Sequence, residues 1–288
     1  NDNKISTNLE YFKKFIMVDI TEEELKSLKR QLMKLKLESK LRQNLAKELD
    51  RLKIIAEKAE LLAKEKSEEI EAIANQLSKY LSPQLYDSIF SGEKKVIINS
   101  EKKFLTVFFS DLVSFTNISD TMASVPLTKM LNDYLTKMTD IALSYGATID
   151  KYIGDAIMVF FGDPETKGKE KDAINCVEMA KKMQIEMNNM SKEWKKTYSL
   201  NAPLKIRIGI NSGECTVGNF GSERRLDYTA IGSPVNLASR LESLAPHSGI
   251  LISNSTHSLI KDSIECNEYG EIEVKGFKNK FKTFNVKL

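Results

Sequence analysis

Residues 149–162 read IDKYIGDAIMVFFG, and two apolar runs in this stretch are separated by a short Ile-Gly-Asp turn. The pattern predicts two strands, residues 147–152 and 156–161, joined by a tight hairpin. Asp155 then lies at the hairpin tip, where its side chain has no role in packing. Its carboxylate is a candidate ligand for a hard cation.

A second carboxylate follows the apolar run in LTVFFSDLVSFT, residues 105–116. Residues 104–110 predict a buried strand, and Asp111 comes directly after it, before a turn into a helix. Two aspartates on adjacent strand ends suit a pair of Mg²⁺ ions about 3.5 to 4 Å apart, an arrangement common in phosphoryl transfer. Each aspartate taken alone has the more ordinary interpretation of a turn former or helix N-cap.

Helix and strand patterns alternate along the rest of this region and predict an α/β sandwich. The predicted helices cover residues 126–145, 173–194 and 235–244. The predicted strands cover residues 204–210 and 214–219, on either side of an Asn-Ser-Gly turn at 211–213, and residues 250–253, 272–274 and 283–286.

The N-terminal part has a different organisation, because its apolar residues follow the 4-3 spacing typical of a coiled coil. The apolar positions of this repeat form the seam along which two helices would pair. Lys66 and three alanines occupy seam positions and reduce its apolar contact area, so we expect an adjustable dimer contact. An earlier leucine run ends at Leu35 in a different phase, so the register shifts before Leu45; this shift could transmit rotation or be a local defect in a continuous helix. The seam comprises Leu45, Leu49, Leu52, Ala56, Ala59, Ala63, Lys66, Ile70, Ile73, Leu77 and Tyr80.

The helical pattern breaks at Ser82-Pro83, a short amphipathic piece follows over residues 84–90, and Gly92 ends it. We therefore place a domain boundary between Gly92 and Ser100.

Composition excludes several classes of protein. With 43 basic and 40 acidic residues the formal net charge is only +3, which gives no reason to expect a nucleic-acid partner. The three cysteines form no CxxC pair, which argues against a disulfide framework or zinc cluster and favours a reducing cytoplasm. No apolar run approaches the roughly 20 residues that span a bilayer. Because the chain begins with Asn1, we expect a fragment of a longer protein, whose missing part could tether it to a membrane.

Two further stretches, IRIGINSGECTVGNFG at 206–221 and LDYTAIGSPVNLASRLES at 226–243, complete a set of four ordered motifs. Together they resemble the catalytic domain of class III adenylate and guanylate cyclases, over residues 97–288. The resemblance implies a ferredoxin-like α/β fold that acts as a head-to-tail dimer with active sites at the interface. The expected organisation is a segment at 1–21 that could end an upstream domain, a coiled-coil stalk at 22–81, a short transducer element at 82–96 and a catalytic domain at 97–288.

The resemblance also implies a role for each matching residue. It makes Asp111 and Asp155 the ligands of two Mg²⁺ ions, which Mn²⁺ could replace, with the Leu112 carbonyl helping one ion. The other implied roles are adenine recognition by Lys151 and Thr229, ribose orientation by Asn236, transition-state charge stabilisation by Arg240, β- and γ-phosphate binding by Arg207 and Lys275, and phosphate contacts from the amides of Leu112, Val113, Ser114 and Phe115.

The chemistry of these residues bears on the choice of base. Lys151 has only donors, which suits the N1 acceptor of adenine and not the protonated N1 of guanine. The family more often has Asp where this chain has Thr229, and a hydroxyl, which can also donate, discriminates less sharply. Guanylate cyclases carry Glu and Cys at these two places, and this chain has neither.

Three candidates have ordinary alternative interpretations. Asn236 and Arg240 are four residues apart and fall on one helix face, which could simply be solvated. Arg207 lies opposite the apolar face of its strand and could be an exposed arginine.

We expect an adenylate cyclase that converts ATP to cyclic AMP as a homodimer, controlled through the stalk by an upstream sensor. With Thr229 in place of the commoner Asp, the chain resembles the subclass of these cyclases that responds to bicarbonate, which implies activation by bicarbonate. The alternatives are a guanylate or mixed-substrate cyclase and, in another class, a non-catalytic nucleotide-binding dimerisation module.

Overall fold

A computed structural model describes residues 21–81, 86, 100–198, 200, 202–273 and 280–288. The chain divides into two compact units, Asn1–Gln76 and Leu77–Leu288. The predicted amphipathic piece at 84–90 lies outside the described residues except for Tyr86.

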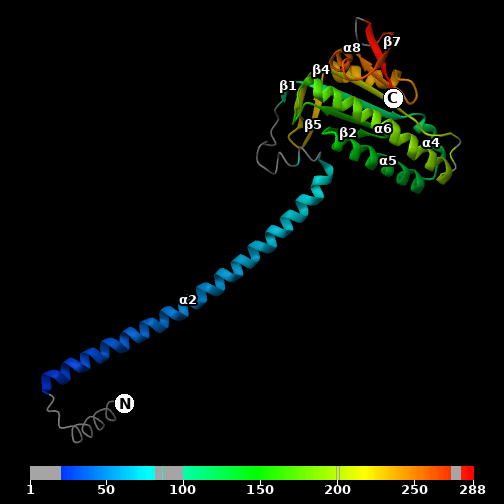
Figure 1. Ribbon diagram of the computed structural model, residues 1–288. Helices are drawn as coiled ribbons and strands as arrows, with labels where there is room; N and C mark the ends of the chain where they lie inside the picture. The colour runs from blue at the N-terminus through cyan, green and yellow to red at the C-terminus, as the bar shows by residue number, and fades with distance from the viewer. Residues whose placement is uncertain (1–20, 82–85, 87–99, 199, 201, 274–279) are drawn as a thin grey trace. The chain divides into compact units, whose positions relative to one another are not determined.

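The described part of the first unit belongs to helix α2, Glu22–Leu77 (Figure 1). Its start is a capping box, in which the Thr21 amide donates to Glu24 Oε2 at 3.0 Å and the Glu24 amide donates to Thr21 Oγ1 at 3.4 Å. A 3₁₀ turn, η1 (Ser78–Tyr80), follows, so regular helix ends three residues before the end of the predicted seam. The helix is unbroken between Leu35 and Leu45, so the predicted shift is a change in the side-chain pattern alone.

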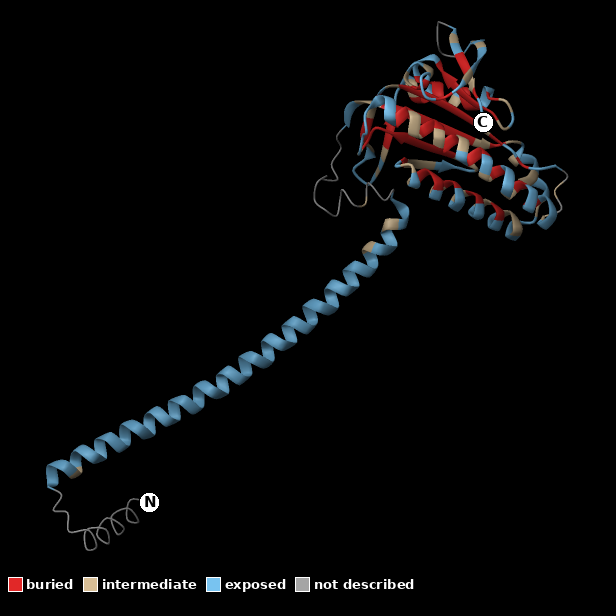
Figure 2. Cartoon of the chain, viewed as in Figure 1, coloured by how far each residue is buried: buried red, intermediate tan, exposed pale blue. Residues whose placement is uncertain are grey.

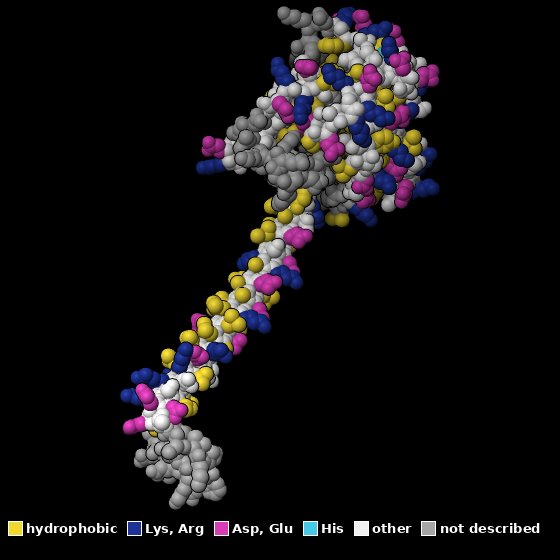
Figure 3. All heavy atoms as spheres, turned by 60° about the vertical axis from the view of Figure 1, so that its left-hand side comes forward, with side chains coloured by type: hydrophobic (Ala, Val, Ile, Leu, Met, Phe, Trp, Pro, Cys, Tyr) yellow, Lys and Arg dark blue, Asp and Glu magenta, His cyan; other side chains and the backbone are white. Residues whose placement is uncertain are grey.

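The apolar seam of α2 is uncovered in the single chain, and no residue of the helix is buried (Figure 2). Leu49 is 71% exposed and Ile70 is 65% exposed. Figure 3 shows apolar side chains following one another along the visible face of the helix, with charged side chains beside them. Such a continuous apolar stripe is unusual for an isolated helix in water.

The second unit is built on an eight-stranded mixed sheet. Seven strands follow the order β2-β3-β1-β4-β6-β8-β7, and β5 pairs with β4 off this path. Neighbouring strands are antiparallel except β4 and β6, which are parallel. The strands are β1 (Ser100–Leu112), β2 (Thr148–Ile153), β3 (Ala156–Phe161), β4 (Ile206–Ser222), β5 (Arg225–Ile231), β6 (Ile250–Ser253), β7 (Cys266–Ile272) and β8 (Phe281–Val286).

Helices pack on the two faces of the sheet, and side chains along each strand alternate between these faces. On β1, Phe108 joins the core formed with α5 and α6, whereas Val107 and Phe109 join a second core with β5 and α7. Figure 2 shows the resulting buried layers. The helices of this unit are α4 (Phe115–Thr121), α5 (Ser124–Ser144), α6 (Lys169–Thr197), α7 (Ser233–Leu244) and α8 (Asn254–Ile260). The mixed α+β fold confirms the predicted fold class.

One strand prediction is wrong, because residues 206–222 form the single strand β4 and not two strands around a turn. The small polar residues at 211–213 are explained by close packing. Asn211 donates to the Pro234 carbonyl at 2.9 Å, and the Ser212 hydroxyl lies 2.9 Å from that of Thr106. A Cβ on Gly213 would lie 2.9 Å from the Pro234 ring. Asn211 and Gly213 therefore let α7 approach the sheet, whereas the Ser212 hydroxyl lies 3.0 Å from that of Thr256 on α8.

The helix expected after the Asp111 turn is α4. Other elements were not predicted from the sequence: α8, β5 and most of β7, of which the predicted strand at 272–274 meets only the last residue. Each is short, and β5 and β7 have exposed residues through much of their length. Within the described residues, no helix combines the length and the apolarity needed to cross a bilayer.

Candidate active site

Two carboxylates come together where β1 ends beside the β2–β3 turn. Asp111 is near the end of β1, and Asp155 lies in the turn between β2 and β3. The pairing of β1 with β3 brings them close, and the Leu112 amide donates to Asp155 Oδ2 at 3.1 Å. Burial, and then the adjacent Asp111 carboxyl, raise the pKa of Asp155 to about 7. The fold thus places two like charges side by side.

This pair fits a divalent cation. Carboxylate oxygens are preferred ligands of Mg²⁺ and Mn²⁺, and a cation between the two groups would relieve the repulsion that raises the pKa of Asp155. In the described part of the chain, no three His, Cys, Asp or Glu residues gather as a metal-binding group. Further ligands would therefore have to come from the backbone, the substrate or water.

Arg207 is not the exposed arginine of the alternative interpretation. It pairs in register with Asp111 across β1 and β4, and its Nη2 lies 2.9 Å from Asp111 Oδ2 and 3.2 Å from Glu242 Oε1. Its side chain is only 25% exposed. Burial raises the pKa of Glu242, and the positive charge of Arg207 opposes that rise. Arg207 is thus an ion-pair partner of the carboxylate cluster.

The turn after β1 differs from the expected cradle of four amides. Two are engaged within the chain: the Leu112 amide bonds to Asp155, and the Val113 amide donates to the Lys205 carbonyl at 2.8 Å. The reason is that β1 extends to Leu112, beyond its predicted end at residue 110. Ser114 then adopts a left-handed conformation with φ 62° and starts α4. The amides of Ser114 and Phe115 remain as candidate phosphate donors.

The two residues predicted to recognise the base meet through a third residue, Asp150. The Thr229 hydroxyl on β5 donates to Asp150 Oδ2 at 2.6 Å, and the Lys151 ammonium on β2 lies 3.2 Å from Asp150 Oδ1. Lys151 is 39% exposed, whereas the Asp150 side chain is fully buried. The fold therefore brings the two predicted residues together from distant parts of the sequence.

The remaining candidates, Asn236 and Arg240, are exposed on α7, one helical turn apart. Among the described residues, neither side chain has a hydrogen-bond or ion-pair partner. Both are available to a ligand. Lys275 lies outside the described residues.

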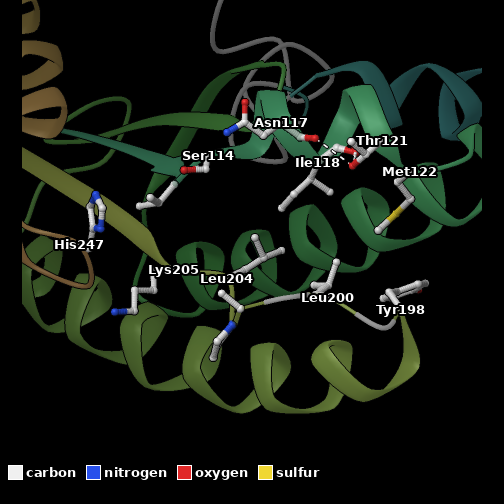
Figure 4. Close-up of a pocket in the computed structure, with 13 residues that line it drawn as sticks. Ser114, Asn117, Ile118, Thr121, Met122, Tyr198, Leu200, Leu204, Lys205 and His247 are labelled. Carbon is white, nitrogen blue, oxygen red and sulfur yellow. Dashed lines mark hydrogen bonds between the residues drawn. The ribbon is translucent and has the colours of Figure 1, made fainter.

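A cavity of about 700 Å³ lies next to the turn after β1 (Figure 4). Its lining includes Ser114, Asn117, Lys205 and His247, as the close-up shows. Neither the carboxylate pair nor the residues that meet at Asp150 line it. Among the described residues of the candidate site, only Val113 and Ser114 line this cavity.

Comparison with known proteins defines the family. A family model described as "Adenylate and Guanylate cyclase catalytic domain" matches residues 98–288. The chain belongs to the class III nucleotidyl cyclase family. This match confirms the resemblance found in the four sequence motifs.

The relatives of this chain include proteins named as adenylate cyclases and proteins named as guanylyl cyclases. An "Adenylate cyclase" of Anabaena cylindrica is 30% identical over 75% of this chain and 42% of its own length. "Retinal guanylyl cyclase 2" of Bos taurus is 31% identical over 75% of this chain and 19% of its own length. The solved adenylyl cyclase CyaB from P. aeruginosa is 50% identical with a TM-score of 0.64, covering 66% of this chain and 96% of that one. The chain thus spans less than half the length of these two curated relatives.

Sequence reasoning did not find two residues of the candidate site, Asp150 and Glu242. Both lie inside the quoted motifs, Asp150 beside Lys151 and Glu242 two residues after Arg240, so the available signal was a carboxylate near a predicted ligand. Asp150 is an extra residue in a β-bulge, between the pairs Ile149–Val159 and Lys151–Met158, so strand alternation does not predict its direction. Glu242 acts through Arg207, a contact that depends on the packing of α7 on β4.

Proposed function

We propose that this cyclase is an adenylate cyclase that converts ATP to cyclic AMP and pyrophosphate. The observation that carries the proposal is the pair of facing carboxylates, Asp111 and Asp155, in a chain that also presents Lys151 and Thr229 together. The first pair suits metal-assisted transfer at a phosphate, and the second suits adenine.

Asp111 and Asp155 would hold two Mg²⁺ ions, or Mn²⁺ in their place, with the Leu112 carbonyl as a further ligand. Such ions supply the chemistry of lowering the pKa of the ribose 3′-hydroxyl and neutralising the leaving triphosphate. Arg207, freed from Asp111 when a cation takes its place, would reach the β- and γ-phosphates together with Lys275. The amides of Ser114 and Phe115 would add phosphate contacts.

The exposed pair on α7 would act on the reacting centre. Asn236 would orient the ribose so that its 3′-hydroxyl lies in line with the α-phosphorus. Arg240 would stabilise charge that grows at the α-phosphate in the transition state, which raises kcat and not only affinity. Both side chains lack described partners, which leaves them free for this role.

We further propose that the enzyme is a homodimer with composite sites. The uncovered apolar seam of α2 needs a partner, and a second copy of the same helix would cover it. Each site would then combine Asp111 and Asp155 of one chain with Lys151, Thr229, Asn236 and Arg240 of the other. An upstream sensor could alter this interface through the stalk.

The test is to incubate the purified chain with ATP or GTP, and Mg²⁺ or Mn²⁺, and to identify the product. Cyclic AMP from ATP, formed faster than cyclic GMP from GTP, is the expected result. Asp111→Ala and Asp155→Ala should abolish turnover while far-UV circular dichroism stays unchanged. Asp262→Ala, a carboxylate outside the motifs, serves as the control. No product with either nucleotide would support the non-catalytic module, and a preference for GTP would support a guanylate cyclase.

A further inference from the structure

The carboxyl of Asp150 is buried between the two candidate base-recognition residues. Its Oδ2 accepts from the Thr229 hydroxyl at 2.6 Å and from the Ala230 amide at 3.3 Å. Its Oδ1 has the Lys151 ammonium 3.2 Å away as an ion pair, although the angles do not make a hydrogen bond. With its side chain fully buried, Asp150 has no role at the solvent surface.

Hydrogen-bond chemistry gives this contact a direction. An ionised carboxylate can only accept, so the hydroxyl donates its one proton to Asp150 at 2.6 Å and not to the Ala230 carbonyl, which is 3.5 Å away. Burial raises the pKa of Asp150, but the Thr229, Lys151 and Ala230 contacts all oppose that rise and favour the ionised form. Thr229 is then left with only lone pairs to offer a ligand.

We propose that Asp150 is a specificity-determining positioning residue, which holds the Thr229 hydroxyl proton so that this side chain can only accept a hydrogen bond from the base. The inference rests on the proposed adenylate cyclase function. Adenine presents a donor, the 6-amino group, where guanine presents an acceptor, O6. An acceptor-only Thr229 therefore favours adenine and opposes guanine.

This arrangement removes the ambiguity of a hydroxyl at this position. A free threonine can donate or accept, and would tolerate either base. Paired with Asp150, it matches the hydrogen-bonding character of the aspartate that the family more often carries there. Two residues from different strands, Thr229 on β5 and Asp150 on β2, would thus perform the task of one carboxylate.

The experiment compares kcat/KM for ATP, GTP and the triphosphate of purine riboside in the parent and in Asp150→Asn. Purine riboside keeps the N1 acceptor for Lys151 but has no group at C6, so the ATP to purine riboside ratio reports on the C6 contact alone. In Asp150→Asn the amide can donate to the Thr229 oxygen and release the hydroxyl proton. We expect this ratio to fall roughly tenfold, as for loss of one hydrogen bond, and GTP to gain relative to ATP.

Asp172→Asn is a matched control. Asp172 is also buried and accepts from a threonine hydroxyl, that of Thr166 at 2.6 Å, and from one amide, that of Lys167 at 3.0 Å. It lies outside the candidate site, so its substitution should leave both nucleotide ratios unchanged. Thermal melts of both variants separate a loss of stability from a change in selectivity.

Two further variants test the route through Thr229. Thr229→Val should lower the ATP to purine riboside ratio as Asp150→Asn does, and combining the two should lower it no further. Thr229→Asp added to Asp150→Asn should restore the preference for ATP, because a carboxylate accepts without help. Thr229→Val alone does not contain Asp150→Asn, so it tests the C6 contact even if Asp150→Asn folds poorly.

The outcomes separate the two proposals. A parent that forms no cyclic AMP, or that prefers GTP, overturns the adenylate cyclase function. A parent that prefers ATP, with an Asp150→Asn variant in which ATP and purine riboside triphosphate decline equally, overturns this inference alone. In that case Asp150 would act only through Lys151.

Discussion

At the scale of single residues, the protonation of Asp155 is the property most open to measurement. Its pKa of about 7 is above the unfolded value of 3.8, so the folded metal-free protein binds this proton more tightly. The stability that this proton contributes to the folded state is fully present below pH 3.8. It is lost as the pH rises from 3.8 to about 7. Mg²⁺ must displace the same proton, so its binding should strengthen over that range.

We therefore predict that the increase in Tm caused by Mg²⁺ grows as pH rises from about 6 to about 8, near the pKa of Asp155. Thermal melts with and without Mg²⁺ across this range measure it. Asp155→Asn removes the titrating group and should abolish both the metal effect and its pH dependence. A Mg²⁺ shift in Tm that is constant with pH in the parent would contradict the assignment.

A second residue-scale prediction concerns nucleotide choice. Lys151→Glu with Thr229→Cys introduces the residues of guanylate cyclases and should shift kcat/KM toward GTP. The new glutamate would lie beside Asp150, which now pairs with Lys151 at 3.2 Å, so repulsion should make the shift incomplete. Adding Asp150→Asn should complete it. Activity assays with both nucleotides test this, and a triple variant no better than the double variant would contradict it.

At the scale of elements, the packing of α7 on β4 positions Asn236 and Arg240. A Cβ at Gly209 would lie 2.0 Å from the Glu242 amide nitrogen and 2.4 Å from the Ala238 carbonyl oxygen, both backbone atoms. The helix would have to move away from the strand. A Cβ at Gly213 would meet only the Pro234 ring, at 2.9 Å.

We predict that Gly209→Ala destabilises the protein by about 3 kcal/mol, near the upper end for overpacking, and also lowers kcat. Gly213→Ala should cost less in both respects, because only a side chain must give way. Denaturant unfolding and steady-state kinetics compare the two. Equal effects on stability would show that α7 is not held at the distance that β4 sets.

At the scale of the whole molecule, the composite-site proposal predicts complementation. Homodimers of Asp111→Ala, which lack a metal ligand, and of Arg240→Ala should each be nearly inactive. For Arg240→Ala the loss should be on the order of 10² to 10³, as for removing one strong transition-state donor. A mixed dimer has one site with both lesions and one intact site. Random exchange should therefore restore about a quarter of the parent rate, since about half of the dimers are mixed.

The measurement is activity after the two variants are mixed under conditions that allow exchange, with exchange followed through a tag on one variant. Asp111→Ala mixed with Asp155→Ala is the control, because both lesions then lie in the same part of the site and no mixed dimer has an intact site. Recovery in that control, or its absence in the first mixture despite exchange, would refute the interface model.

The sequence by itself determined the family, the mixed α+β fold and the long helix α2. Those features depend on local periodicity and on motifs that are contiguous along the chain, such as the apolar runs on either side of Asp155. Hairpin β2–β3 was predicted to within one residue at each end. The carboxylates of Asp111 and Asp155 could also be anticipated, because each directly follows or separates apolar strands.

Only the tertiary structure decided where polar residues inside elements make their contacts. Asn211, Ser212 and Gly213 have the composition of a turn, yet they lie in a continuous strand. Asn211 and Gly213 pack beneath α7, and Ser212 contacts Thr256 of α8. Asp150 becomes part of the base-recognition group only when a bulge in β2 turns it toward Thr229. Such contacts join residues far apart in sequence, and the side-chain pattern of one strand carries no information about its distant partner.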